Sequence, residues 1–93
     1  MKASATDLER LLNSVGKGIF VEFYDQFRNT MLSDQDLQDL LPKNYTLKSR
    51  ISRVSKARRI FREKLEIDAL NNIRGSTKVD DETRKLADRV LRR

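Results

Sequence analysis

The chain has 93 residues, a formal net charge of +6, and neither cysteine nor histidine. This length suits one small helical or mixed domain, which we expect to span residues 1–93. The missing residue types remove disulfides, thiolate zinc sites, cysteine nucleophiles and the commonest general base. We therefore do not expect an enzyme, and we expect no cofactor and no metal.

The hydropathy pattern gives no sign of a membrane segment. The N-terminus, MKASATDLERLL, lacks the apolar centre of a signal peptide. The longest apolar run, residues 18–21, is far shorter than the ~20 residues of a membrane span. A cytoplasmic protein with no membrane partner is the expectation.

The first two helices are predicted from a capping pattern and from the spacing of apolar residues. Thr6 and Glu9 form a capping box for a helix over residues 7–15, which the sequence GKG at residues 16–18 ends. A second helix over residues 18–30 is predicted because its apolar residues recur one, three and four positions apart. We expect this stripe in the core, not on a base-stacking platform. It consists of Ile19, Phe20, Phe23, Tyr24 and Phe27.

A short acidic helix and a long basic helix follow. The first, over residues 34–41, opens with Ser33 and Asp36 in a second N-terminal box. PKNY at residues 42–45 predicts a turn, after which Thr46 caps a helix over residues 47–73, straight or bent. The inward side of this fourth helix is expected to contain Leu47, Val54, Phe61 and Leu65, with Ile51 and Ala69 beside them.

A last helix within residues 78–93 is signalled by Asp80 as its cap and by acids in its first turn. No segment alternates between apolar and polar residues, so no sheet is expected. The predicted fold class is all-α: a small bundle of four or five helices that contains a helix-turn-helix over residues 33–64 with a long basic fourth helix.

The positive charge is concentrated in one segment. Residues 45–64 hold eight Lys or Arg and a single acid, Glu63. The bases from Lys48 to Arg58 therefore lack the acidic i,i+4 neighbours that form ion pairs along a helix. Holding them together costs stability unless a polyanion neutralises them, which favours nucleic-acid binding over a merely solvated helix face.

The fourth helix places bases and hydroxyls on the side opposite Leu47, where they can reach phosphates and base edges in a major groove. An acidic helix, a turn and a basic helix are also the parts of a helix-turn-helix. We expect the protein to bind double-stranded DNA as a transcriptional or nucleoid-associated regulator, or as the DNA-binding part of a larger assembly. The candidate nucleic-acid-binding residues are Thr46, Lys48, Ser49, Arg50, Ser52, Arg53, Lys56 and Arg59.

The stretch LSDQDLQDLL, followed by TLKSRISRVSKARRIFREKL, resembles the helix-turn-helix of region 4 in bacterial sigma factors of the extracytoplasmic-function type. The similarity covers residues 32–65. It implies a capping role for Thr46 and a DNA-backbone contact for Arg50. It also makes Lys48, Ser49 and Arg53 candidates for contact with bases or phosphates.

Two positions depart from that family. Gln38 stands where the family usually has a small residue, and Pro42 stands in place of glycine in a turn that is one residue shorter. The resemblance therefore implies a DNA-binding element and not sigma activity.

A helical protein–protein interaction module, such as an adaptor, an antitoxin or a polymerase-binding factor, is the alternative function. Ile60, Ile67 and Leu70 lie off the main apolar line of the fourth helix. They indicate a second seam, through which a homodimer or another protein partner can bind. A helix lying on a membrane surface is less well supported, because the bulky apolar edge of such helices is lacking.

Overall fold

The computed structural model describes the backbone of residues 5–93 and the side chains from residue 7 onward. Over this range the chain is all-helical with no strand, which confirms the predicted fold class. Seven helices, in place of four or five, make up the described chain because two predicted helices are each divided in two. Their bounds are α1 Ala5–Val15, α2 Lys17–Glu22, α3 Tyr24–Arg28, α4 Asp34–Leu40, α5 Leu47–Arg62, α6 Glu66–Arg74 and α7 Asp81–Leu91.

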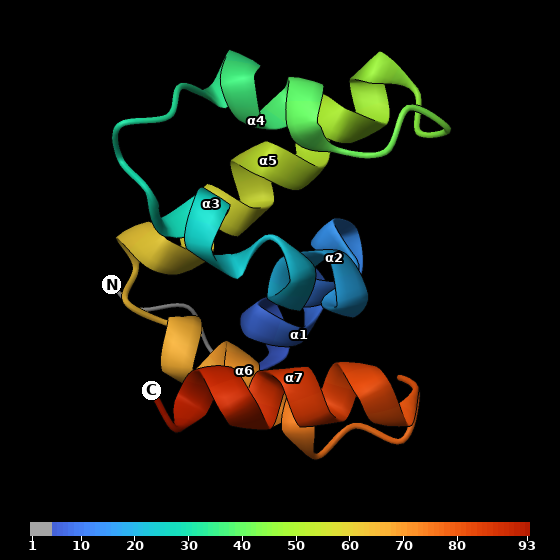
Figure 1. Cartoon of the computed structure of the whole chain (residues 1–93), viewed down its shortest axis with the longest axis vertical. Coiled ribbons are helices and arrows are strands. Elements are labelled where there is room, and N and C mark those ends of the chain that lie inside the picture. Colours follow the sequence, from blue (N-terminus) through green and yellow to red (C-terminus); the bar gives the residue numbers. More distant parts are fainter. Residues whose placement is uncertain (1–4) are drawn as a thin grey trace.

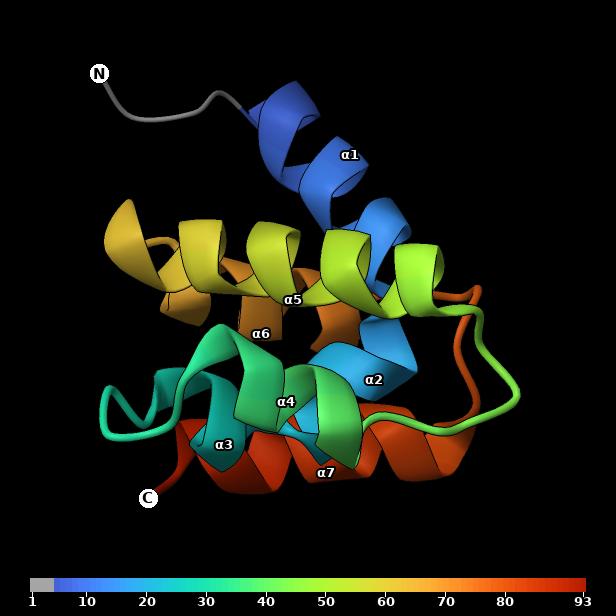
Figure 2. The same cartoon turned by 90° about the horizontal axis from the view of Figure 1, so that it is seen from above.

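The helices form three groups along the longest axis of the molecule (Figure 1). α4 and the first part of α5 lie at one end, α6 and α7 lie at the other, and α1, α2 and α3 lie between them. From above, α5 runs between α1 and α4, with α6 behind it (Figure 2). The N-terminal helices therefore supply the middle of the core, and the other two groups pack on them.

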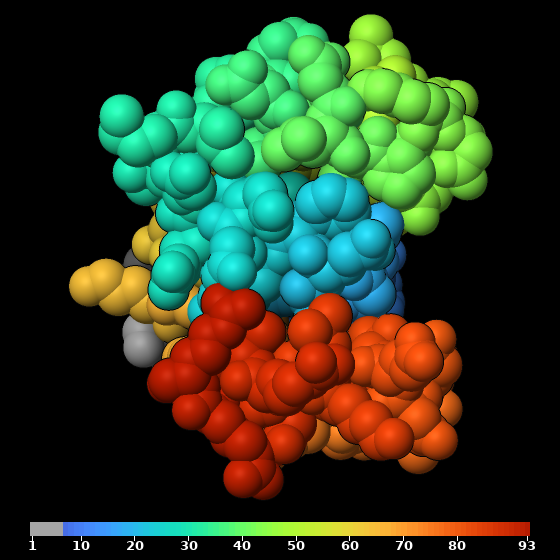
Figure 3. All heavy atoms as spheres, viewed as in Figure 1, coloured from blue at the N-terminus to red at the C-terminus, as the bar shows by residue number. Residues whose placement is uncertain are grey.

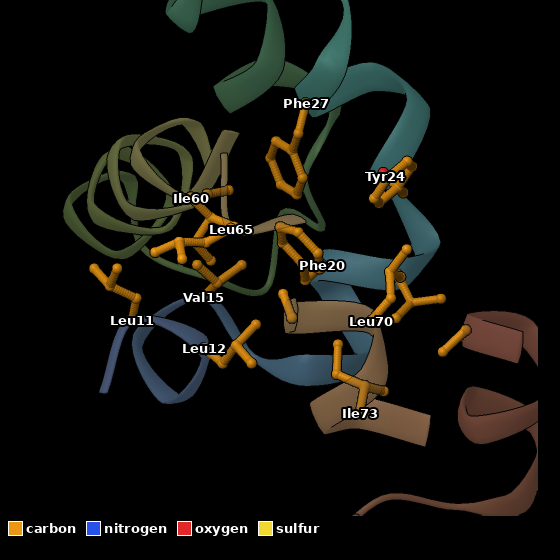
Figure 4. Packing of buried hydrophobic residues seen from close by; sticks show 14 of the residues in the cluster. Leu11, Leu12, Val15, Phe20, Tyr24, Phe27, Ile60, Leu65, Leu70 and Ile73 are labelled. Atoms are coloured by element: carbon orange, nitrogen blue, oxygen red, sulfur yellow. The ribbon is translucent and has the colours of Figure 1, made fainter. Parts of the chain in front are cut away.

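Phe20 lies at the centre of that core (Figure 4). Its ring centroid is 5.8 Å from that of Tyr24, 6.3 Å from that of Phe27 and 5.6 Å from that of Phe61. These are the distances of favourable aromatic pairs. The prediction that the aromatic stripe lies in the core is confirmed, although Phe23 is only partly buried.

Side-chain caps begin three helices as predicted. At α4, the Ser33 hydroxyl accepts a 3.0 Å hydrogen bond from the N–H of Asp36, and the N–H of Ser33 donates to the Asp36 carboxylate at 3.0 Å. This backbone donor stabilises the charged carboxylate and holds the pKa of Asp36 below its ordinary value. Thr46 and Asp80 accept backbone hydrogen bonds of 3.1 and 2.8 Å at the starts of α5 and α7.

The predicted capping box at the start of the first helix depends on the Thr6 side chain, which is outside the described part of the structure. The helix α1 already includes Ala5, so it begins before the predicted start at residue 7. Glu9 accepts a 2.7 Å hydrogen bond from Asn72 and lies 3.1 Å from the Lys17 ammonium. The Asn72 hydrogen bond and then the Lys17 contact lower the pKa of Glu9, and together they tie α1 to α6 and α2.

The predicted helix over residues 18–30 is divided at Phe23 into α2 and α3. Phe23 has φ −105° and ψ 22°, away from helical values. Its N–H still donates to the Ile19 carbonyl at 3.0 Å, and its carbonyl accepts from the N–H of Phe27 at 2.9 Å. The two helices therefore meet at a bend and not at a loop.

The predicted long fourth helix ends early, because α5 stops at Arg62 and the chain turns at Lys64. This residue has φ 58°, a left-handed conformation that glycine favours, yet no glycine is near it in the sequence. The N–H of Leu65 donates to the Ile60 carbonyl at 2.9 Å and that of Lys64 to the Phe61 carbonyl at 3.0 Å, which is the Schellman pattern of helix ends. Burying Leu65 contributes ~1.5–3 kcal/mol. That gain exceeds the ~1–2 kcal/mol cost of a left-handed residue other than glycine, so the chain turns here and α6 starts anew.

Replacement of Lys64 tests this explanation. Lys64→Gly should raise the free energy of unfolding by about 1 kcal/mol, because glycine adopts positive φ without strain at Cβ. Lys64→Ala removes the same charge but keeps the Cβ, and it should change the free energy by less than about 0.5 kcal/mol. Urea unfolding followed by circular dichroism measures both. Equal stabilisation by the two variants would show that charge, and not backbone strain, dominates at this position.

Candidate nucleic-acid interface

α5 is packed along one side and open along the other. Val54, Ala57 and Ile60 are buried against the neighbouring helices. The predicted inward side of this helix is wrong at the N-terminal end of α5, because Leu47 is 54% exposed and Ile51 is 45% exposed. At 100° per residue the buried side centres about 80° from the direction of Leu47. α5 is therefore rotated relative to the prediction, and its open side carries a different set of residues.

Arg53 lies on the packed side of α5, where its polar groups find partners. Its Nη1 donates to the carbonyl of Val15 at 2.6 Å, and its Nε donates to the Ser49 hydroxyl at 3.0 Å. The guanidinium carbon lies 3.9 Å from the centre of the Tyr45 ring, a cation–π contact. Val15 ends α1, so its carbonyl has no partner within that helix. Arg53 therefore caps α1 and links it to the loop that leads into α5.

The chain turns from α1 into α2 next to this arginine. Gly16 has φ 91°, which only glycine adopts without strain, and a Cβ at this position would lie 2.9 Å from Arg53 Nη1. The predicted helix break at residues 16–18 is thus confirmed. It lets the guanidinium of Arg53 approach the end of α1.

Arg50 and Arg58 also bind backbone carbonyls of neighbouring segments. Arg50 Nη1 donates to the carbonyl of Gln38, near the end of α4, at 3.3 Å. Arg58 Nη2 donates to the carbonyl of Leu32 at 2.5 Å, and its Nε lies 3.5 Å from the Asp34 carboxylate. The order of these contacts shows that α4 runs antiparallel to α5.

Three of the predicted DNA-contact residues are therefore engaged inside the chain. The guanidinium groups of Arg50 and Arg53 are half-buried and bonded to carbonyls, and the Ser49 hydroxyl accepts from Arg53. Their role in the structure is to hold α5 in place. The resemblance to the sigma-factor helix implied that these three residues face DNA. Hydropathy and residue spacing could not reveal the backbone carbonyls that accept hydrogen bonds from the two arginines.

The other predicted residues lie at or near the open side. Thr46, Lys48 and Ser52 are exposed, and Lys56 is half-buried. Neither lysine has a hydrogen-bond or ion-pair partner among residues 7–93. Arg59 is exposed too, but its Nε lies 2.5 Å from the Glu63 carboxylate.

Sequence reasoning missed part of the open side, because it used Leu47 as the inward reference. Ser55 and Arg62 are exposed, although Arg62 was expected nearer the apolar side. Residues 47–62 contain no acid, so the open side is positive along its whole length. We call this surface the α5 strip. It consists of Leu47, Lys48, Ile51, Ser52, Ser55, Arg59 and Arg62.

A separate hollow of about 750 Å³ lies between α2, α7 and the Tyr45 loop. Figure 3 shows it as a notch between the green loop before α5 and the orange start of α7. Its charges are mixed, since Glu22 and Glu82 face the same space as Lys85 and Arg89. Within residues 5–93 no three His, Cys, Asp or Glu side chains gather to hold a metal ion. The notch therefore offers no concentrated charge of either sign.

The apolar residues that the sequence indicated as a seam for a protein partner are mostly buried within this chain. Ile60 and Leu70 are buried in the core, and only Ile67 of the three is exposed, at 52%. No helix in the described range 5–93 is long and apolar enough to cross a bilayer. Of the five large apolar residues that are exposed in the described chain, Leu47 and Ile51 lie on the α5 strip, beside its lysine and arginines.

α4 and α5 have the order and contact of a helix-turn-helix. Residues 41–46 join them, α4 packs on α5, and the N-terminal half of α5 presents exposed side chains. The chain matches no protein-family model, no curated protein and no solved structure. The resemblance to sigma-factor region 4 accordingly stays a prediction.

The capping role of Arg53 can be measured as stability. Arg53→Ala should lower the free energy of unfolding by about 1.5–3 kcal/mol, because the Val15 carbonyl loses a charged donor. Arg59→Ala is the matched control, since it removes an exposed ion pair of ~0–1 kcal/mol from the same helix. Denaturant unfolding of both variants gives the comparison. Equal losses would mean that Arg53 does not organise the fold.

Proposed function

We propose that this protein binds double-stranded DNA through the α5 strip, as a regulator of helix-turn-helix type or as the DNA-binding part of a larger assembly. The observation that carries the proposal is the exposed side of α5, which combines Lys48, Arg59 and Arg62 with two serines, in a helix that contains no acid. Such cations neutralise phosphates and release counterions. Serine hydroxyls donate to phosphates or to base edges.

The shape of the strip favours duplex DNA over RNA. An α-helix fits the major groove of B-DNA, which is ~12 Å wide. The major groove of A-form RNA is deep and narrow, so side chains cannot read it. α5 is open along its length, from Leu47 to Arg62, and can lie in the wider groove.

The internal bonds of Arg50, Arg53 and Arg58 limit how strongly binding depends on salt. Eight bases in the segment 45–64 would suggest many phosphate contacts, but these three guanidinium groups are engaged with carbonyls. The three cations of the α5 strip, Lys48, Arg59 and Arg62, correspond to a log–log salt slope of about −2.7, at ~0.9 per phosphate.

The first test is a titration of duplex DNA over a series of salt concentrations, read by fluorescence anisotropy. Lys48→Ala should weaken binding and make the salt slope shallower by about 0.9, because one phosphate contact is lost. Lys85→Ala is the matched control, since Lys85 on α7 is an exposed lysine with no hydrogen-bond or ion-pair partner among residues 7–93. The proposal fails if the wild-type chain binds no duplex, or if the two variants change the slope equally. Co-purification of a protein partner together with absence of DNA binding would favour the interaction module.

Two apolar residues give the proposed interface a base preference. Leu47 and Ile51 are exposed beside Lys48 and Ser52, in the half of α5 that meets the bases when a recognition helix enters the groove. Apolar side chains in the major groove contact the 5-methyl group of thymine. We therefore expect preferred sites to contain thymine opposite this part of α5.

Replacement of thymine by deoxyuridine tests the base preference, because it removes only the methyl group. Each contacted methyl should contribute ~0.8 kcal/mol, so its removal should weaken wild-type binding about fourfold. Ile51→Ala should abolish the difference between the two duplexes. Ile67→Ala, which alters an equally exposed isoleucine on α6, should retain it. If the wild-type protein does not distinguish the duplexes, Leu47 and Ile51 do not read bases.

A further inference from the structure

A smaller hollow adjoins the C-terminal half of the α5 strip. It encloses about 360 Å³ between α3, the segment that links α3 to α4, and α5. Ser55 and Arg62 line it and also belong to the α5 strip, so a molecule bound on the strip meets this hollow directly. We call it the arginine pocket, because Arg28, Arg58 and Arg62 all line it.

The three arginines are not equivalent. Arg58 is engaged with the Leu32 carbonyl and the Asp34 carboxylate, so it forms the wall of the pocket. Arg28 and Arg62 are exposed and have no hydrogen-bond or ion-pair partner among residues 7–93. Since Asp34 is the only acid among the lining residues, the pocket keeps an excess of positive charge.

The rest of the lining suits a tetrahedral oxyanion. The hydroxyls of Thr30 and Ser55 are exposed, make no hydrogen bond within residues 7–93, and supply neutral donors beside the two free guanidinium groups. Phe27 and Phe61 form an apolar floor, which lowers the local dielectric constant and strengthens attraction to an anion. Guanidinium groups bind phosphate through paired N–H donors, so phosphate is the ligand class that fits.

The position of the pocket along α5 matches the path of a DNA backbone. α4 runs antiparallel to α5, which places the acid Asp39 beside the N-terminal half of α5, next to the Gln38–Arg50 contact. At the other end of the helix, Arg28, Arg58 and Arg62 against the single acid Asp34 give a larger excess of positive charge. In helix-turn-helix proteins the N-terminal part of the recognition helix meets bases, while more distant residues contact the backbone.

We propose that the arginine pocket binds one backbone phosphate of the duplex, held by Arg28 and Arg62 together with the hydroxyls of Thr30 and Ser55. This inference rests on the proposed function and adds Arg28 and Thr30, from outside the helix-turn-helix, to the interface. Because both arginines act on the same phosphate, their effects on the salt slope are not additive.

The test compares Arg28→Gln, Arg62→Gln and the double variant in duplex titrations at several salt concentrations. Each single variant and the double variant should make the salt slope shallower by about 0.9, corresponding to one phosphate in all three cases. Arg89→Gln is the matched control and should leave the slope unchanged, because Arg89 on α7 is exposed and has no hydrogen-bond or ion-pair partner within the described residues 7–93. Circular dichroism establishes that all variants fold.

The outcomes separate this inference from the proposed function. If wild-type protein binds duplex and Arg28→Gln has the wild-type slope, the pocket is not a phosphate site although DNA binding stands. If the salt slope of the double variant is shallower by about 1.8, the two arginines contact two separate phosphates, and the shared site is overturned. If wild-type protein binds no duplex, the proposed function fails, and inorganic pyrophosphate then tests the pocket alone. Shifts of the Thr30 and Ser55 amide signals that Arg28→Gln abolishes would support a free-phosphate site, and absence of shifts would overturn it.

Discussion

The hydrogen bond from Arg53 to the carbonyl of Val15 is the interaction on which the exposed surface of α5 depends. This bond turns a basic residue toward the core. At 2.6 Å it supplies a donor to a carbonyl at the C-terminal end of α1, which has no partner within that helix. Once this side of α5 is fixed against α1, Val54, Ala57 and Ile60 face inward. Leu47 and Ile51 must then face solvent, although their hydropathy alone would place them in the core.

Local signals in the sequence predicted most of the fold. Helix starts at Ser33, Thr46 and Asp80 were found because capping involves residues only three positions apart. The division at Lys64 could not be found in this way, since a lysine in a left-handed conformation is stabilised by the burial of Leu65, which only the folded chain supplies. The number of helices was underestimated for this reason and because of the bend at Phe23.

The candidate site was less predictable than the fold, because the partners of arginine side chains are set by tertiary structure. Lys48, Ser52 and Arg59 are exposed as the sequence suggested, whereas Arg50 and Arg53 are turned inward. The sequence shows that acidic partners are missing from residues 45–62, but it does not show backbone carbonyls that accept in their place. Part of the positive charge that seemed to require a polyanion is therefore accommodated within the chain.

The use of main-chain acceptors by Arg50, Arg53 and Arg58 has a consequence for how this scaffold can change. A carbonyl is present whatever side chain its residue carries, so substitutions at Gln38 or Leu32 keep the acceptor as long as the backbone path is kept. A guanidinium donates several N–H groups and a peptide carbonyl accepts through two lone pairs, so these bonds need no particular side chain at the accepting residue. The position of α5 therefore tolerates sequence change in the segments that it binds, and the residues of its open side can vary separately from those that hold it.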